Sequence, residues 1–169
     1  MRGGPASWIR LACLALALGG LLGAPCNPGE KKTRVTVVPS ASSVGTFSPL
    51  TVDILVDSPT PIQAFELGLR WDPKMLSAFF VFPHPEFDDD GAFFTSPYWN
   101  HQAGRLDRVV DLRHGGAGAE GSFKVATLWF MSRGSAGSTS IAPTSGELAD
   151  GDGNEPQVSI APVTITIEP

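Results

Sequence analysis

Recognisable catalytic motifs are missing from this sequence. Its 169 residues contain no Gly-x-Ser-x-Gly nucleophile, no phosphate-cradling loop and no His-Glu-x-x-His pair. The three histidines, His84, His101 and His114, are scattered and lack the spacing of metal ligands. No pair of carboxylates stands out as the acid and base of a glycosidase. We therefore predict that the protein is not an enzyme and that it uses no cofactor.

Apolar runs long enough to span a membrane are also missing. The run Leu11–Gly23 has 13 residues, which is too short for a membrane-spanning helix but fits the apolar centre of an export signal. Arg2 and Arg10 supply the positive charge that such signals carry before this centre. The sequence therefore predicts a signal peptide at residues 1–26, a polar tether at residues 27–33 and one folded domain at residues 34–169.

Cysteine is scarce, with only Cys13 and Cys26 in the chain. Cys13 leaves with the signal peptide, so a disulfide within the mature domain is excluded. Cys26 stands where a bacterial lipoprotein carries its lipidated cysteine, although Pro25 departs from the small residue usual before it. Lipid anchoring and free secretion both remain open, and the unpaired Cys26 favours the anchor. Labelling with a fatty-acid analogue, with and without Cys26→Ala, separates a cell-surface or outer-membrane lipoprotein from a secreted protein.

Basic residues are fewer than acidic residues in the chain. The chain has 12 lysines and arginines against 17 acids, and loss of two arginines with residues 1–26 changes its net charge from −5 to −7. An acidic surface argues against nucleic acid and against an anionic membrane as partners. We therefore expect membrane contact only through a lipid anchor.

Helical periodicity is absent, since no ten-residue window repeats its apolar residues at 3.6-residue spacing. Instead, short alternating runs are separated by turns rich in the chain's 15 prolines and 19 glycines. In Ile62–Trp71, for example, Phe65, Leu67 and Leu69 alternate with polar or small residues and Asp-Pro ends the run. About nine such runs predict an all-β, nine-stranded sandwich.

Several segments, in their order, resemble the cohesin family. They include "LTVDILVDS", "IQAFELGLRWDPKML", "GRLDRVV", "GAEGSFKVATLWFM" and the terminal "VTITI", and the match runs from about Arg34 to the end. The resemblance implies a jelly-roll β-sandwich and a non-catalytic module that binds a dockerin-type protein partner through one sheet face. It also implies a link to polysaccharide degradation, because dockerins attach such enzymes to scaffolds.

The resemblance also implies where the partner binds. Residues Ala64 and Glu66 match outward positions that contact dockerin in the family, although Ala64 lacks the amide side chain usual there. We predict that a neighbouring strand adds a second row of outward side chains, with Asp107, Val109 and Asp111, next to Glu66 and Arg70. We also predict that Tyr98 and Trp99 lie near the same face and act as aromatic anchors. The predicted partner-binding residues are Ala64, Glu66, Arg70, Tyr98, Trp99, Asp107, Val109 and Asp111.

Two other functions remain open at this stage. The first is a carbohydrate-binding module, in which Trp99 or Trp129 with Tyr98 stacks on polysaccharide; Trp129 is predicted to point outward on the opposite sheet. The second is an envelope-assembly lipoprotein that binds neither dockerin nor sugar.

A metal site has weak support from one loop only. Asp150, Asp152 and Asn154 have the first three spacings of a calcium loop, but Glu155 replaces the required glycine and Ala161 the final glutamate. A polar turn is the favoured interpretation.

Overall fold

The computed structural model describes residues 32–87, 93–94, 98–112, 118–156 and 158–169, without the side chains of residues 93, 94, 111 and 112. The predicted signal peptide, Cys26 and most of the predicted tether fall outside these ranges and remain predictions. Across the part of the chain that is described, no helix is long and apolar enough to cross a membrane.

All regular elements in these ranges are β-strands, which confirms the all-β prediction. The described ranges contain twelve strands, three more than the nine that the sequence predicts. The described strands are β1 (Thr33–Pro39), β2 (Ser43–Gly45), β3 (Pro49–Ile62), β4 (Ala64–Arg70), β5 (Leu76–Pro83), β6 (Phe93–Phe94), β7 (Tyr98–Asn100), β8 (Arg105–Leu112), β9 (Ala119–Ser132), β10 (Gly137–Ala149), β11 (Val158–Ile160) and β12 (Val163–Glu168).

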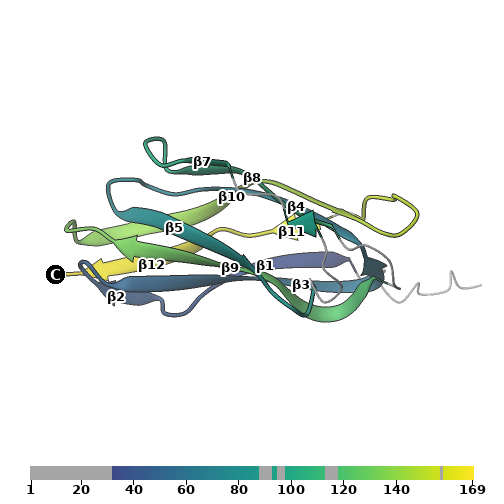
Figure 1. The fold of residues 1–169 in the computed structure, drawn as a ribbon. Helices are drawn as coiled ribbons and strands as arrows, with labels where there is room; N and C mark the ends of the chain where they lie inside the picture. Colours follow the sequence, from purple (N-terminus) through teal and green to yellow (C-terminus); the bar gives the residue numbers. More distant parts are fainter. Residues whose placement is uncertain (1–31, 88–92, 95–97, 113–117, 157) are drawn as a thin grey trace, which may run out of the picture. The chain divides into compact units, whose positions relative to one another are not determined.

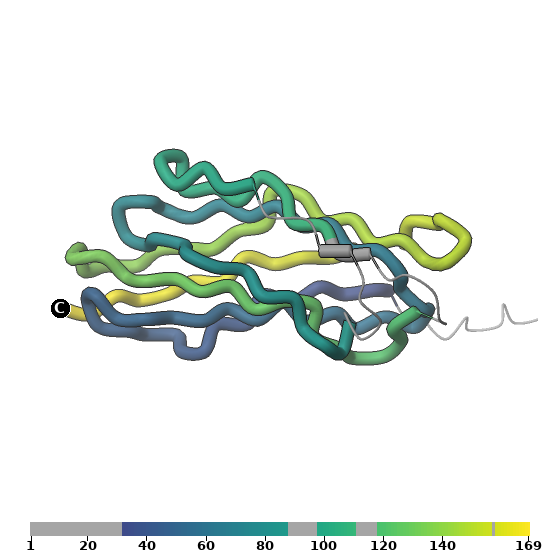
Figure 2. Tube along the Cα trace, viewed as in Figure 1, coloured from purple at the N-terminus to yellow at the C-terminus, as the bar shows by residue number. Residues whose placement is uncertain are grey.

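The strands form two sheets that face each other as a sandwich (Figures 1 and 2). The five-stranded sheet has the order β11-β1-β3-β9-β5, and the seven-stranded sheet has the order β2-β12-β10-β4-β8-β6 with β7 paired to β8. The pairs β1–β11 and β12–β2 are parallel, and the other described pairs are antiparallel. The chain passes repeatedly between the sheets, as in a jelly roll.

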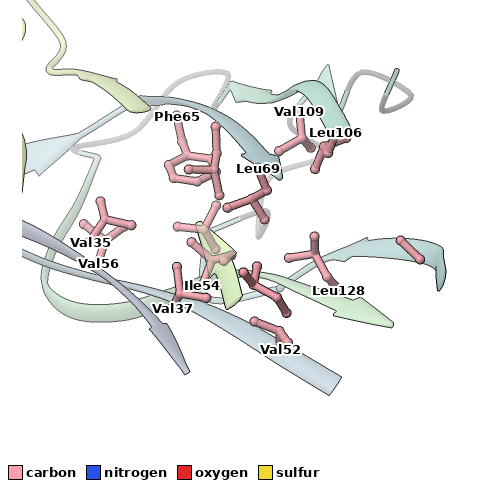
Figure 3. Packing of buried hydrophobic residues seen from close by; sticks show 14 of the residues in the cluster. Val35, Val37, Val52, Ile54, Val56, Phe65, Leu69, Leu106, Val109 and Leu128 are labelled. Atoms are coloured by element: carbon pink, nitrogen blue, oxygen red, sulfur yellow. The ribbon is translucent and has the colours of Figure 1, made fainter. Parts of the chain in front are cut away.

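The core lies between the sheets and is built by alternation (Figure 3). In β3, Val52, Ile54 and Val56 point inward and are buried. In β4, Leu67 and Leu69 face them from the other sheet and are equally buried. Because successive side chains of a strand point to opposite faces, this inward row fixes which residues of β4 point outward.

A tight turn ends β4 at the sequence Trp-Asp-Pro. The backbone N–H of Trp71 donates to the Gly104 carbonyl at 2.8 Å, and the Asp72 carboxylate accepts a 2.8 Å bond from the Lys74 N–H. The Trp71 ring is buried against Phe130, with the ring centroids 5.3 Å apart. Proline removes a ladder donor at this point, so the strand ends and β5 begins in the other sheet.

Gly68 in the middle of β4 lies between two β-bulges. Leu67 of β4 pairs with Val109 of β8, and Leu69 pairs with Leu106. Between these two pairs β4 has one residue and β8 has two, so β8 carries one extra residue. The register with β10 shifts at the same place, between Pro143 and Ser145. A Cβ atom on Gly68 would lie 2.6 Å from Ser145 Oγ and 3.0 Å from the Asp107 carbonyl oxygen. Only glycine fits this close approach, and the two bulges set the phase of the strands on either side.

Candidate functional site

A shallow pocket of about 220 Å³ lies on the outer surface of the seven-stranded sheet, over β4, β8 and β10. Its floor includes three small or medium apolar side chains, Ala64, Val110 and Ala149. Polar side chains surround them, namely Glu66, Arg108, Glu147 and Glu155. We call this surface the acidic pocket.

Strand register explains why these side chains meet. Glu66 of β4 lies directly opposite Val110 of β8 on one side and Glu147 of β10 on the other. One step along the outward row, Ala64 lies opposite Ala149. Side chains directly opposite on one face of antiparallel strands have their Cβ atoms about 5 Å apart, so the rows form one continuous surface.

The pocket carries more negative than positive charge. Arg108 Nη2 lies 2.9 Å from Glu66 Oε2, and the Arg108 side chain is 63% exposed. Glu147 and Glu155 line the same pocket, and neither has an ion-pair partner among the described residues. Two carboxylates directly opposite each other, as at Glu66 and Glu147, repel and are mildly destabilising. Because three glutamates and one arginine line the pocket, its net charge is negative.

The predicted partner-binding residues are divided by the structure. Ala64 and Glu66 lie in the acidic pocket. Arg70 is exposed at the far end of β4, opposite Arg105, and lines no part of the pocket. Asp107 forms an ion pair with Arg105 and also lies outside the pocket. The outward row of β4 thus extends beyond the pocket toward the Asp-Pro turn.

The predicted outward orientation of Val109 is wrong. Its side chain is 1% exposed and packs in the core beside Leu106, as Figure 3 shows. The bulge opposite Gly68 adds one residue to β8 and reverses the alternation, so Val110 lines the acidic pocket instead, although it is only 8% exposed. The backbone of Asp111 pairs with Phe65, and its side chain lies outside the described part.

Of the two predicted aromatic anchors, Tyr98 is the more exposed. Tyr98 of β7 pairs with Arg108 of β8, next to the acidic pocket, and is 69% exposed. Trp99 pairs with Leu106 and is partly buried, with its ring edge-on to Trp71 at 6.0 Å between centroids. The His101 ring stacks on Trp99 at 5.8 Å. Trp99 is therefore only partly available as an anchor, because one side of it packs against the core.

Asp150, Asp152 and Asn154, which have the spacing of a calcium loop, form a hydrogen-bonded turn after β10. Asp150 Oδ1 accepts bonds from the N–H groups of Asp152 and Asn154, at 3.0 and 2.8 Å. Asp150 Oδ2 accepts a 2.9 Å bond from the Asn154 side chain. The Asn154 side-chain bond, followed by its backbone bond, lowers the pKa of Asp150 below its ordinary value. These contacts agree with the favoured interpretation of a polar turn.

Besides the buried Phe65 and Leu148, five residues that line the acidic pocket were absent from the predicted set: Arg108, Val110, Glu147, Ala149 and Glu155. The adjacent valines at 109 and 110 were the available signal of an irregularity in β8, because successive side chains of a regular strand point to opposite faces. Nothing in the sequence links Glu147 to Glu66, since their contact depends on the pairing of strands about 80 residues apart.

Comparison with known proteins identifies the fold. No family model and no curated protein sequence matches the chain. Among solved structures, a non-cellulosomal cohesin from Archaeoglobus fulgidus matches with a TM-score of 0.67 and 16% identity, covering 82% of this chain and 93% of that one. A type II cohesin domain from the cellulosome of Acetivibrio cellulolyticus matches with a TM-score of 0.68 and 16% identity, covering 80% and 95%.

A type I cohesin–dockerin complex from Clostridium thermocellum also matches, with a TM-score of 0.66 and 15% identity, covering 82% of this chain and 95% of that one. The three likenesses span type I, type II and non-cellulosomal cohesins. At these identities they show the fold alone: the chain is a cohesin-like jelly-roll β-sandwich, as the sequence predicted.

Proposed function

We propose that this cohesin-like domain is a non-catalytic recognition module that binds a dockerin-type protein through the outer face of β10, β4 and β8. The observation that carries the proposal is the acidic pocket. It combines small apolar side chains at the centre with charged side chains around them, which is the general composition of a protein-binding surface. The likeness to cohesins that were solved in complex with dockerins supports the same function.

The charges of the pocket indicate the chemistry of the partner. Glu147 and Glu155 carry charge that no described cation neutralises, and Glu66 is held by Arg108 alone. A partner that presents lysine or arginine at this point gains attraction, and a partner that presents acid is repelled. We therefore propose that the bound element of the dockerin-type module places a basic side chain beside Glu147.

The test is a titration of the protein against a panel of type I and type II dockerin modules, followed by calorimetry. We expect at least one dockerin to bind. Glu147→Lys should weaken that binding about tenfold or more at low salt, equivalent to about 1.4 kcal/mol. The loss should shrink at high salt, because exposed charges are screened.

Glu120→Lys is the matched control. Glu120 is exposed on β9 of the opposite sheet, and its replacement changes the net charge by the same amount. We expect its affinity to stay within about twofold of the original, since surface substitutions away from a contact have small effects. Absence of binding to every dockerin would refute the dockerin partner, and equal losses for both variants would refute the proposed face.

The cellular setting remains part of the proposal. An exported module, anchored at Cys26 or secreted, would meet its partner outside the cytoplasm. A dockerin-type partner would connect the protein to enzymes that degrade polysaccharides. These points depend on the sequence predictions for residues 1–33.

A further inference from the structure

Four large aromatic side chains are exposed together on the outer face and edge of the five-stranded sheet. Phe79, Phe80 and Phe82 of β5 are 50%, 56% and 49% exposed, and Trp129 of β9 is 45% exposed. Successive ring centroids along this series lie 6.3, 5.8 and 6.4 Å apart. We call these four residues the aromatic strip. The predicted outward orientation of Trp129 is confirmed, and its three phenylalanine neighbours are new.

A bulge in β5 brings the phenylalanines to the surface. Ala78 pairs with Phe130, and Phe80 pairs with Trp129, so Phe79 is an extra residue between them. Val81 is the inward residue between Phe80 and Phe82 and pairs with Leu128 of the core. Burying an aromatic side chain would be favourable, and a contiguous exposed group of them therefore indicates a binding surface more strongly than scattered apolar residues do.

A row of polar side chains lies directly beside the aromatic strip. Thr127 pairs with Phe82 on one side and with Asp53 of β3 on the other. Its hydroxyl donates to Asp53 Oδ1 at 2.6 Å, and Lys124 Nζ lies 2.7 Å from Asp53 Oδ2. Partial burial raises the pKa of Asp53, but the bonds from Lys124 and Thr127 outweigh it, and the pKa lies below its ordinary value. Asp53 and Lys124 thus form a charged pair with no net charge.

We propose that the aromatic strip and its polar row form a second binding site, whose ligand is an uncharged polysaccharide. A sugar ring has an apolar C–H face and a rim of hydroxyl groups. The strip offers aromatic faces for the first, and Asp53, Thr127 and Lys124 offer hydrogen-bond donors and acceptors for the second. A row of rings suits an extended chain of sugars better than a single one.

The charges and the edge of the sheet argue against other ligands. The Asp53–Lys124 pair is neutral overall, so this pair gives no net attraction to phosphate groups or to an anionic membrane. A second copy of the chain would add to the edge of β5 through backbone hydrogen bonds. The bulge at Phe79 interrupts that edge, and bulges are a common means of preventing such pairing.

The polysaccharide site is independent of the proposed dockerin-type interaction. The aromatic strip belongs to β5 and β9 of the five-stranded sheet, and the acidic pocket belongs to the seven-stranded sheet. A variant of the strip should leave binding at the acidic pocket unchanged, so the two proposals can fail separately.

The experiment measures retention of the full chain on insoluble cellulose, xylan and chitin. We expect retention on at least one of them. Trp129→Ala and Phe82→Ala should each weaken retention about tenfold or more, because stacking on an aromatic face depends on the ring. Phe47→Ala is the control, since Phe47 is the most exposed aromatic residue described and lies outside the strip. Its retention should match that of the original protein.

A second variant separates stacking from loss of structure. Trp129→Phe keeps an aromatic ring and should keep most of the retention, but a change in tryptophan fluorescence on adding soluble oligosaccharides of the retaining polymer should disappear. No retention on any polymer, or equal retention of the Trp129→Ala and original proteins, would overturn the proposal. Concentration-dependent self-association that the strip variants abolish, without retention, would assign the strip to a second copy instead and would also overturn it.

Discussion

Val109→Asp should lower the free energy of unfolding by about 4 kcal/mol or more, whereas Val110→Asp should lower it by clearly less, about 2 kcal/mol. Val109 is 1% exposed and packs in the core, so an aspartate there would bury a charge with no partner. Val110 is only 8% exposed, but it lies outside the core cluster and lines the acidic pocket, so an aspartate there can turn toward water. Its cost then comes from the lost burial of the valine and from repulsion by Glu66 on the paired strand.

Chemical denaturation followed by circular dichroism measures the difference. Because the two residues are neighbours and the substitutions are identical, differences in unfolded-chain properties largely cancel. Equal destabilisation by the two variants would contradict the β8 bulge opposite Gly68. A larger effect at Val110 would restore the regular alternation that the sequence suggested.

Ala64→Arg should reduce affinity for the dockerin-type partner about 30-fold or more, the effect of a residue at the centre of an interface. Ala64 lines the acidic pocket opposite Ala149, so a long side chain would fill the space between them. The new guanidinium would also pair with the carboxylates of the acidic pocket, which in our proposal bind the basic group of the partner. Stability should change little, because Ala64 is only partly buried at the surface.

The control for this variant is Thr36→Arg. Thr36 is exposed on β1 of the five-stranded sheet, so it tests the effect of an added arginine away from the acidic pocket. Calorimetry with the same dockerin should give an affinity close to that of the original protein. Unchanged affinity of Ala64→Arg would remove the pocket from the interface.

Local alternation was sufficient to predict β4 and its faces. Leu67 and Leu69 point inward, Glu66 points outward, and the Asp-Pro turn ends the strand as expected. These features depend on the period of a strand and on the chemistry of proline, both of which are local. Together with the family resemblance they were enough to locate Ala64 and Glu66 within the acidic pocket.

The face of β8 could not be predicted by the same rule. Its extra residue reverses the alternation, and it lies opposite Gly68 of the neighbouring strand, where a Cβ atom would not fit. Counting every second residue across a bulge assigns each later side chain to the wrong face. The bulge alone explains why Val110, and not Val109, lines the acidic pocket.

The aromatic strip shows a different limit of sequence reasoning. The segment "LSAFFVF" is almost wholly apolar, and its adjacent phenylalanines cannot both point into the core from a regular strand. Only the pairing of β5 with β9 shows that Phe80 and Phe82 join Trp129 at the surface.

The most direct test of the proposed interface is a chemical-shift map of the isotope-labelled protein with a bound dockerin. We expect the largest shifts at the methyl groups of Ala64, Val110 and Ala149 and at neighbouring amides of β4, β8 and β10. Residues of β5 and β9 should change little. Shifts concentrated around Trp129 and Phe82, with the methyl groups of the acidic pocket unaffected, would contradict the account.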